Sequence, residues 1–380
     1  MNKSIRFALI TASIVAVGRA APFMAVGDGA ELFATGVVGV RADDNIFLSN
    51  SKTSDTIFDV TPGLELDFGK NAQTQGSLTL ADNFSMYTQH SGLNTNLFQG
   101  DFVTRYDDGK MKMGFDAGYH ELNQNTVDVR AADTGRLIRR DIGTADANGE
   151  VGVSEITAIG AAVQYRHEYY HPAGYISNDQ FTVPVNFYYK WTPKVDLSLG
   201  YQYHDFQAKS GSALDSTDNF YNIGARGEFT PKLTGTFRVG YTERRFSGNQ
   251  SNQNLFGLDA SFAYEFSPKT TVQFGATNDF GTAPQGQQQK NLTGNVLVTT
   301  KINEEFSVNV GLSYRGITYY GLTGPGNRTD DYWEGTIGGA YTINANLRLV
   351  GAYTYRNYKT DIAGSEFNNN VLSVAANFRY

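Results

Sequence analysis

Apolar and polar residues alternate with a period of two along most of this chain. In one segment, Val195, Leu197 and Leu199 alternate with Asp196 and Ser198. Successive side chains of a β-strand point to opposite faces, so this pattern predicts strands with one apolar and one polar face. Each segment has the roughly 9–11 residues that a tilted strand needs to cross a bilayer. The same pattern recurs in residues 233–242, 306–315 and 347–356.

Short breaks interrupt the alternation at a nearly regular spacing. Three of the breaks share an aromatic residue followed by Thr or Ser, Pro and Lys, at residues 191–194, 229–232 and 266–269. Proline suits a tight turn, and an aromatic residue beside such a turn fits a membrane interface. The predicted breaks lie at residues 70–71, 108–109, 157–158, 192–193, 231–232, 268–269, 303–304 and 344–345.

The spacing of the breaks gives a strand count. Two strands and a longer polar segment lie between successive breaks, so eight breaks join sixteen strands, with one more strand at residues 32–47 and another at 367–380. This predicts an all-β fold: a transmembrane antiparallel up-and-down β-barrel of about 18 strands, with 16 as the alternative. We expect short periplasmic turns and longer extracellular loops. A water-soluble sandwich would show the same alternation, but the strand lengths and the chain ends favour the membrane.

The two ends of the chain agree with a bacterial outer-membrane barrel. Lys3 and Arg6 precede an apolar stretch, residues 7–17, that is too short to span a bilayer and is typical of a signal peptide. Cleavage after residue 20 would leave a short periplasmic segment at 21–30 and a barrel at 31–380. The last strand ends on Phe378 and Tyr380. It resembles the closing strand that the barrel-assembly machinery recognises in such proteins.

Composition narrows the functional classes. The 380 residues contain no cysteine, carry a formal charge of −7 and have a mean hydropathy of −0.37. A closed barrel can do without disulfides because each strand is hydrogen-bonded to two neighbours. An acidic chain offers no basic surface for phosphates, so we expect no nucleic-acid partner.

Residues 41–87 carry a recognisable motif. Residues 41–48 read RADDNIFL, residues 54–66 read SDTIFDVTPGLEL, and a further strand follows at 76–87. With the Thr-Pro-Lys breaks, this arrangement resembles the putative β-barrel porin type 2 family over essentially the whole mature chain. The resemblance implies an outer-membrane pore or a barrel associated with exopolysaccharide export, and it brings no catalytic residue.

Motifs that suggest enzyme or metal chemistry are better explained as strand features. His167 and His171 match the zinc pattern H-E-x-x-H, but on a strand four residues span about 13 Å, too far to share one ion. His204 and Asp205 are adjacent, so a strand points them to opposite faces. Residues 43–45 (Asp-Asp-Asn) lack the other ligands of a calcium loop. We therefore predict no enzyme activity, no cofactor and no metal.

The polar strand faces carry charges of both signs, which are tolerable inside a barrel when hydrated or paired. The longest predicted loop, residues 123–148, holds Arg130, Arg136, Arg139, Arg140, Asp128, Asp133, Asp141 and Asp146. It either folds into the lumen and narrows it or lies outside in solvent. The predicted pore-lining residues are Arg105, Lys112, Arg166, Arg226, Arg238, Arg315, Arg348, Arg356, Asp101, Asp116, Glu228, Asp259, Glu265 and Glu334.

These features predict a porin or channel that passes hydrophilic solutes across the bacterial outer membrane. One alternative is an outer-membrane component of exopolysaccharide export that works with periplasmic export proteins. Another is a structural or adhesive barrel that acts through its surface loops. The expected partners are outer-membrane lipid and lipopolysaccharide, the barrel-assembly machinery, and small hydrophilic solutes or saccharides.

Overall fold

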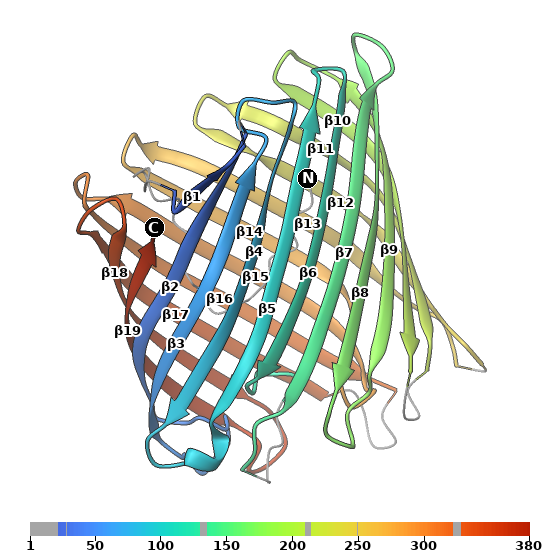
Figure 1. Ribbon diagram of the computed structural model, residues 1–380. Coiled ribbons are helices and arrows are strands. Elements are labelled where there is room, and N and C mark those ends of the chain that lie inside the picture. The colour runs from blue at the N-terminus through green and yellow to red at the C-terminus, as the bar shows by residue number, and fades with distance from the viewer. Residues whose placement is uncertain (1–21, 28, 130–134, 210–213, 249, 322–327) are drawn as a thin grey trace.

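A computed structural model describes residues 22–27, 29–129, 135–209, 214–248, 250–321 and 328–380. Within them, eighteen long strands pair antiparallel with their neighbours in sequence, and β19 pairs with β2 to close a barrel (Figure 1). The strands are β2 (Ala30–Asp43), β3 (Asp55–Phe68), β4 (Thr74–Tyr87), β5 (Thr95–Asp107), β6 (Met111–Asn123), β7 (Arg139–Gly152), β8 (Thr157–Tyr170), β9 (Asn178–Lys190), β10 (Val195–Ala208), β11 (Ser216–Thr230), β12 (Leu233–Phe246), β13 (Gln253–Ser267), β14 (Thr270–Thr282), β15 (Gln288–Lys301), β16 (Phe306–Tyr320), β17 (Arg328–Thr342), β18 (Leu347–Lys359) and β19 (Phe367–Arg379). The predicted 18-strand antiparallel barrel is confirmed.

The two ends of the chain meet at the seam of the barrel. The ladder between β19 and β2 runs from Val371 opposite Asp43 to Arg379 opposite Thr35. Beyond it, the backbone N–H of Ala34 donates to the carbonyl oxygen of Tyr380 at 2.7 Å, and the N–H of Tyr380 donates back at 2.9 Å. A short strand, β1 (Met24–Val26), then pairs with the first residues of β2.

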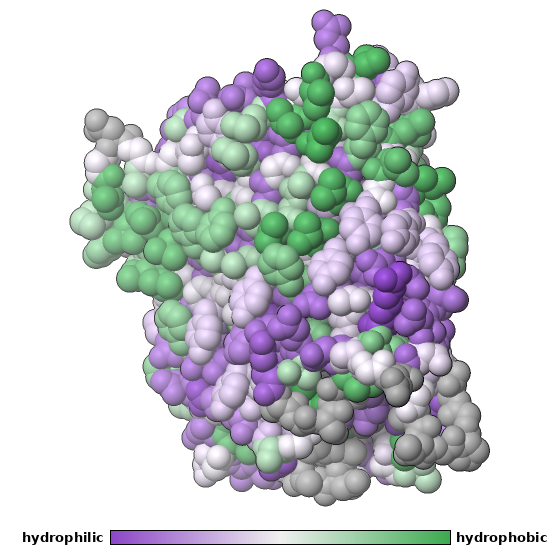
Figure 2. All heavy atoms as spheres, turned by 90° about the vertical axis from the view of Figure 1, so that its right-hand side faces the viewer, coloured by the Kyte–Doolittle hydropathy of each residue, from purple (hydrophilic) through white to green (hydrophobic). Residues whose placement is uncertain are grey.

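The barrel is apolar outside and polar inside. On β19, Leu372 and Val374 point outward and are 58% and 53% exposed, while Ser373 points inward. Inward positions are odd-numbered on β2–β5, β13–β16 and β19, and even-numbered on β6–β12, β17 and β18. Figure 2 shows the outward apolar side chains gathered toward the short-turn end, with polar side chains toward the long-loop end. A water-soluble protein has its apolar side chains inside and its polar side chains outside. The opposite arrangement found here is the one expected for a barrel surrounded by lipid.

The turns between hairpin strands are short at the end where β1 and Tyr380 lie. In the turn between β5 and β6, Gly109 has a φ of +87°, a left-handed conformation that glycine adopts at little cost. The backbone N–H groups of Lys110 and Met111 donate to the Asp108 carboxylate at 3.0 and 2.7 Å. These bonds hold the pKa of Asp108 below its ordinary value, so the turn stays anionic at neutral pH.

Three sequence-based boundaries were wrong. The strand predicted at residues 32–47 ends at Asp43, because the chain turns at Asn45, whose Nδ2 donates to the carbonyl oxygen of Ser49 at 2.8 Å. The other two boundaries involve β7. The loop predicted at residues 123–148 covers only 124–138, because Arg139, Arg140, Asp141 and Asp146 belong to β7. The turn predicted at 157–158 lies at 153–156 instead, and β8 begins at Thr157. The loop end of β7 is polar on both faces: Arg139 forms an ion pair with Glu121 at 3.3 Å on the outward side, and Arg140 one with Glu168 at 3.3 Å inside. With charged residues on both faces, this part of β7 lacks the alternation of apolar and polar residues by which the other strands were predicted.

The motifs that suggested metal chemistry are strand and loop features, as predicted. Residues of H-E-x-x-H extend along β8 and past its end, where His167 contacts Asp179 at 2.6 Å and His171 contacts Asp141 at 3.0 Å. Within the described ranges, no group of three or more His, Cys, Asp or Glu side chains is placed to hold a metal ion. Those ranges also contain no helix long and apolar enough to cross a membrane. The predicted signal peptide, residues 1–20, lies outside the described residues.

The outward position of Leu372 can be tested against its inward neighbour. Replacing Leu372 with Arg is expected to lower the free energy of unfolding in bilayers by up to about 2–4 kcal/mol, because a cation then faces hydrocarbon. Ser373→Arg, which points into the polar interior, should cost far less. Denaturant titration of the barrel in lipid vesicles measures both. Equal losses would contradict the assigned faces.

Candidate functional site

The interior of the barrel is the candidate functional site. All fourteen predicted pore-lining residues lie at inward positions, opposite the exposed apolar side chains. Three ion pairs join members of this set: Arg105 with Asp116 at 2.7 Å, Arg238 with Asp259 at 3.5 Å, and Arg356 with Glu334 at 2.9 Å. Each pair links adjacent strands, so these charges lie along the wall.

Other predicted residues find partners that the sequence did not single out. Lys112 lies 3.7 Å from Asp107, and Asp101 contacts His120 at 3.0 Å. Near the turns, Glu228 accepts from Lys194 at 2.5 Å. Near the loop end, Arg166 pairs with Glu168 at 3.2 Å. Arg348 and Glu265 occupy inward positions near the short-turn end of β18 and β13.

Arg226 forms the longest connection within the wall. Its guanidinium binds both carboxylate oxygens of Glu150 at 2.6 and 2.7 Å, and also Asp196 at 3.0 Å. The ring of Tyr188 stacks beneath it, 3.4 Å from the guanidinium carbon. Glu150 is on β7 and Arg226 is on β11, four strands away. This bidentate pair therefore crosses part of the interior and links two strands that are not neighbours.

Sequence reasoning missed several inward charges at strand ends. Arg244, 1% exposed, binds both carboxylate oxygens of Asp218 at 2.6 and 2.7 Å. Arg41 pairs at 3.0 Å with Asp59, which the sequence pattern had already placed inside, and Arg379 lies 3.5 Å over the ring of Phe33. Extending the period-two alternation to the last residues of each strand would have found all of them.

The described residues of the loop between β6 and β7, 124–129 and 135–138, enter the barrel, and we call them the inward loop. The Asp128 carboxylate accepts from Nη1 of Arg315 at 2.5 Å. Arg315 is on β16, nine strands from β7 in either direction around the ring of eighteen. A contact between these positions requires the loop to cross the lumen. Of the charged residues predicted in this loop, Arg130 and Asp133 lie outside the described residues.

Apolar contacts hold the described parts of the inward loop in this position. Val127 packs against two buried clusters, one that contains Tyr358 on β18 and one that contains Ile317 on β16. At the other end of the loop, Leu137 packs in a cluster with Phe47, and Ile138 packs with Tyr170. Burying these side chains away from water favours the inward position by roughly 1.5–3 kcal/mol for each fully buried large residue.

Neighbouring loops also contribute to the long-loop end of the barrel. Residues 44–54 approach the inward loop, where Nδ2 of Asn125 donates to the carbonyl oxygen of Phe47 at 2.9 Å. Residues 171–177 meet residues 283–287 through the N–H of Ile176 and the carbonyl oxygen of Pro284 at 2.7 Å. Burial raises the pKa of the nearby Tyr175 hydroxyl, which therefore stays neutral.

The long-loop end is therefore narrower than the wall alone would make it. A cavity of about 210 Å³ remains between these loops. It is lined by Phe47, Ser49, Asn50, Ser51, Thr53, Gly135 and Gly364. Loop residues thus cover part of the long-loop end of the barrel, and charged residues of the wall below them are held by partners.

Comparisons with known proteins agree with this architecture. A family model described as "Putative beta-barrel porin 2" matches residues 32–380. No curated protein sequence matches the chain significantly.

Solved barrels that resemble the chain differ strongly in sequence. The outer membrane protein OpdK from Pseudomonas aeruginosa has 10% identity and a TM-score of 0.47, with 92% of this chain and 99% of that chain covered. OccAB4 from Acinetobacter baumannii has 11% identity and a TM-score of 0.48, with coverage of 93% and 99%. OccK2 (OpdF) from Pseudomonas aeruginosa has 9% identity and a TM-score of 0.49, with coverage of 92% and 98%.

The ion pair between Asp128 and Arg315 gives a direct test of the inward loop. Asp128→Asn removes a charge-assisted hydrogen bond worth about 1.5–3 kcal/mol, so the inward position should lose roughly ten- to hundredfold in relative population. Single-channel recording in planar bilayers is expected to show larger or more variable conductance.

Asp116→Asn provides the matched control for that variant. It removes one inward carboxylate whose partner, Arg105, lies on the adjacent strand. Its conductance should stay near that of the unaltered protein. If both variants behave alike, charge rather than tethering explains the effect.

Proposed function

The chain belongs to the Putative beta-barrel porin 2 family, and we propose that it acts as a pore through which small hydrophilic solutes cross the bacterial outer membrane. Its place in that membrane follows from the family and from the closed 18-strand barrel. The family and the channel-like barrel agree with a transport role rather than an enzymatic one.

One observation carries the proposal: a continuous polar and charged inward face runs the length of the barrel. Inward positions such as Asn186, Asn222 and Asn309 supply hydrogen-bonding groups between the ion pairs. An apolar solute would have to desolvate these groups, whereas a hydrated solute can exchange water for them. The inward loop then limits the size of what passes.

The charges of the wall favour one sign of ion. The inward positions of β2–β19 hold twenty Asp and Glu residues against fifteen Lys and Arg residues. Carboxylates in excess attract cations and repel anions when the lumen is water-filled. We therefore infer a weak preference for cations and neutral solutes.

The other two hypotheses have less support. The family description and the similar barrels contain no reference to exopolysaccharide export. An adhesive role would need extended surface loops. The described parts of residues 44–54 and 124–138 instead fold over the lumen and contact its wall.

Liposome swelling tests the proposed function. Vesicles containing the purified barrel should swell in isosmotic solutions of small sugars, and more slowly as the sugar grows. Deleting residues 127–137 should speed the entry of the larger sugars, because the inward loop is then lost. Vesicles that swell no faster than protein-free ones, with either form of the protein, would refute a diffusion pore.

Ion preference gives an independent prediction. With a KCl gradient across a planar bilayer, the reversal potential should show higher permeability for K⁺ than for Cl⁻. The preference should weaken in 1 M salt, where the screening length falls to about 3 Å. It should also weaken in acid, because protonation removes the excess of carboxylate charge. A reversal potential that indicates anion preference at neutral pH would contradict the assignment.

A further inference from the structure

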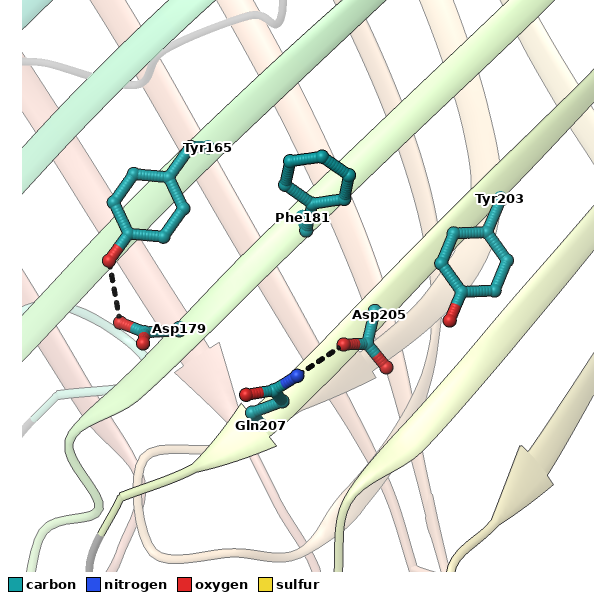
Figure 3. Close-up of a pocket in the computed structure, with 6 residues that line it drawn as sticks. All are labelled: Tyr165, Asp179, Phe181, Tyr203, Asp205 and Gln207. Carbon is teal, nitrogen blue, oxygen red and sulfur yellow. Dashed lines mark hydrogen bonds between the residues drawn. The ribbon is translucent and has the colours of Figure 1, made fainter.

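A depression on the outer surface of the barrel is separate from the pore. It has a volume of about 340 Å³ and lies across β8, β9 and β10 (Figure 3). Its lining residues are Tyr165, Asp179, Phe181, Tyr203, Asp205 and Gln207. Figure 3 shows the three aromatic rings side by side, with the polar side chains on the loop side of them.

The depression opens toward the membrane rather than the lumen. Phe181 shares the outward face of β9 with Val185 and Phe187, all of which are about 40% exposed or more. On the loop side, Asp179 lies opposite Gln207 in the ladder between β9 and β10. The site therefore lies where outward apolar residues give way to polar ones. In a bilayer this is the boundary between hydrocarbon and headgroups.

Tyrosine hydroxyl groups mark the same level elsewhere on the barrel. Within the depression Tyr165 donates to Asp179 at 3.0 Å, and outside it Tyr201 donates to Asn219 at 2.7 Å. On the far side of the barrel, Tyr314 donates to Asp331 at 2.6 Å. Such tyrosines keep the ring in the apolar layer and the hydroxyl in the polar layer.

The polar side of the depression offers both donors and acceptors. Asp179 contacts Nδ1 of His167 at 2.6 Å and Nζ of Lys209 at 3.0 Å. Lys209 also donates to Oε1 of Gln207 at 3.2 Å, and Nε2 of Gln207 donates to Asp205 at 2.7 Å. The result is a connected network of charged and amide groups beside three exposed rings.

We propose that this depression binds a sugar ring in the headgroup of a glycolipid of the outer leaflet. A pyranose ring presents C–H groups that stack on aromatic faces and hydroxyl groups that donate to carboxylates, which are the two chemistries found here. Lys209 and His167 can meet the phosphates that such a headgroup carries. Because the depression lies at the level of the lipid headgroups, a ligand anchored in the membrane can reach it more readily than a soluble sugar. The proposal rests on the outer-membrane location and is independent of solute passage through the lumen.

Native mass spectrometry of the full-length barrel in mild detergent tests the proposal. The probes are lipid A, which carries phosphorylated sugars, and phosphatidylglycerol, which carries a phosphate without a sugar. Lipid A should bind in preference to phosphatidylglycerol. Asp205→Ala should lower the affinity for lipid A about tenfold, because one hydrogen bond to a charged group is lost. Tyr203→Ala should also lower it, because one stacking face is lost.

Asp331→Ala is the matched control, because Asp331 lies beside Tyr314 at the same level on β17. It should leave lipid A binding unchanged, and the heat-modifiable migration of each variant in a gel verifies that the barrel is folded. Unchanged lipid A binding in the folded Asp205 and Tyr203 variants would overturn the proposal. Equal binding of phosphatidylglycerol, or a dimer of the chain in place of bound lipid, would also overturn it. Channel recordings on the same samples would separate this result from any failure of the pore.

Discussion

Closure of the sheet is the constraint on which the rest of the molecule depends. Inside a bilayer an unpaired backbone N–H or C=O group costs several kcal/mol, so a membrane sheet cannot leave an edge open. The ladder between β19 and β2 removes both edges at once. Once the ring is closed, each strand must present one face to lipid and the other to the interior. The apolar outside and the polar inside follow from this single requirement.

The polar inside creates a second requirement, because charges near a low-dielectric wall are stable only when hydrated or paired. Most of the wall pairs join adjacent strands, as Arg105 and Asp116 do. Some connections reach further, among them Arg226 to Glu150 across four strands and Asp128 to Arg315 across the whole barrel. The first stiffens the wall. The second holds part of a loop across the interior of the barrel, so electrostatic pairing affects the shape of the interior as well as its charge.

The barrel and its inward face could be predicted from the sequence, but the arrangement of the loops at the long-loop end could not. Strand alternation is a local property, and it placed all fourteen predicted charges on the correct face. It failed at β7, where Arg139 and Arg140 put charge on both faces near the loop end. The course of the inward loop depends on Arg315, which lies 187 residues away from Asp128 in the chain. No local pattern contains such a contact. The same is true of the outer depression, whose lining comes from three strands.

The seam between β19 and β2 joins the two long strands that lie furthest apart in the described part of the chain. The barrel can close only when β19 and β2 meet, because every other ladder joins neighbours in sequence. Until then, β2 has an unsatisfied edge, and its first residues are covered by β1 rather than by β19. The short hairpin formed by β1 and β2 thus shields the part of the opening strand that the final strand never reaches. Closure of the barrel consequently depends on a contact between strands that are remote in sequence, and it cannot be completed by local hairpins alone.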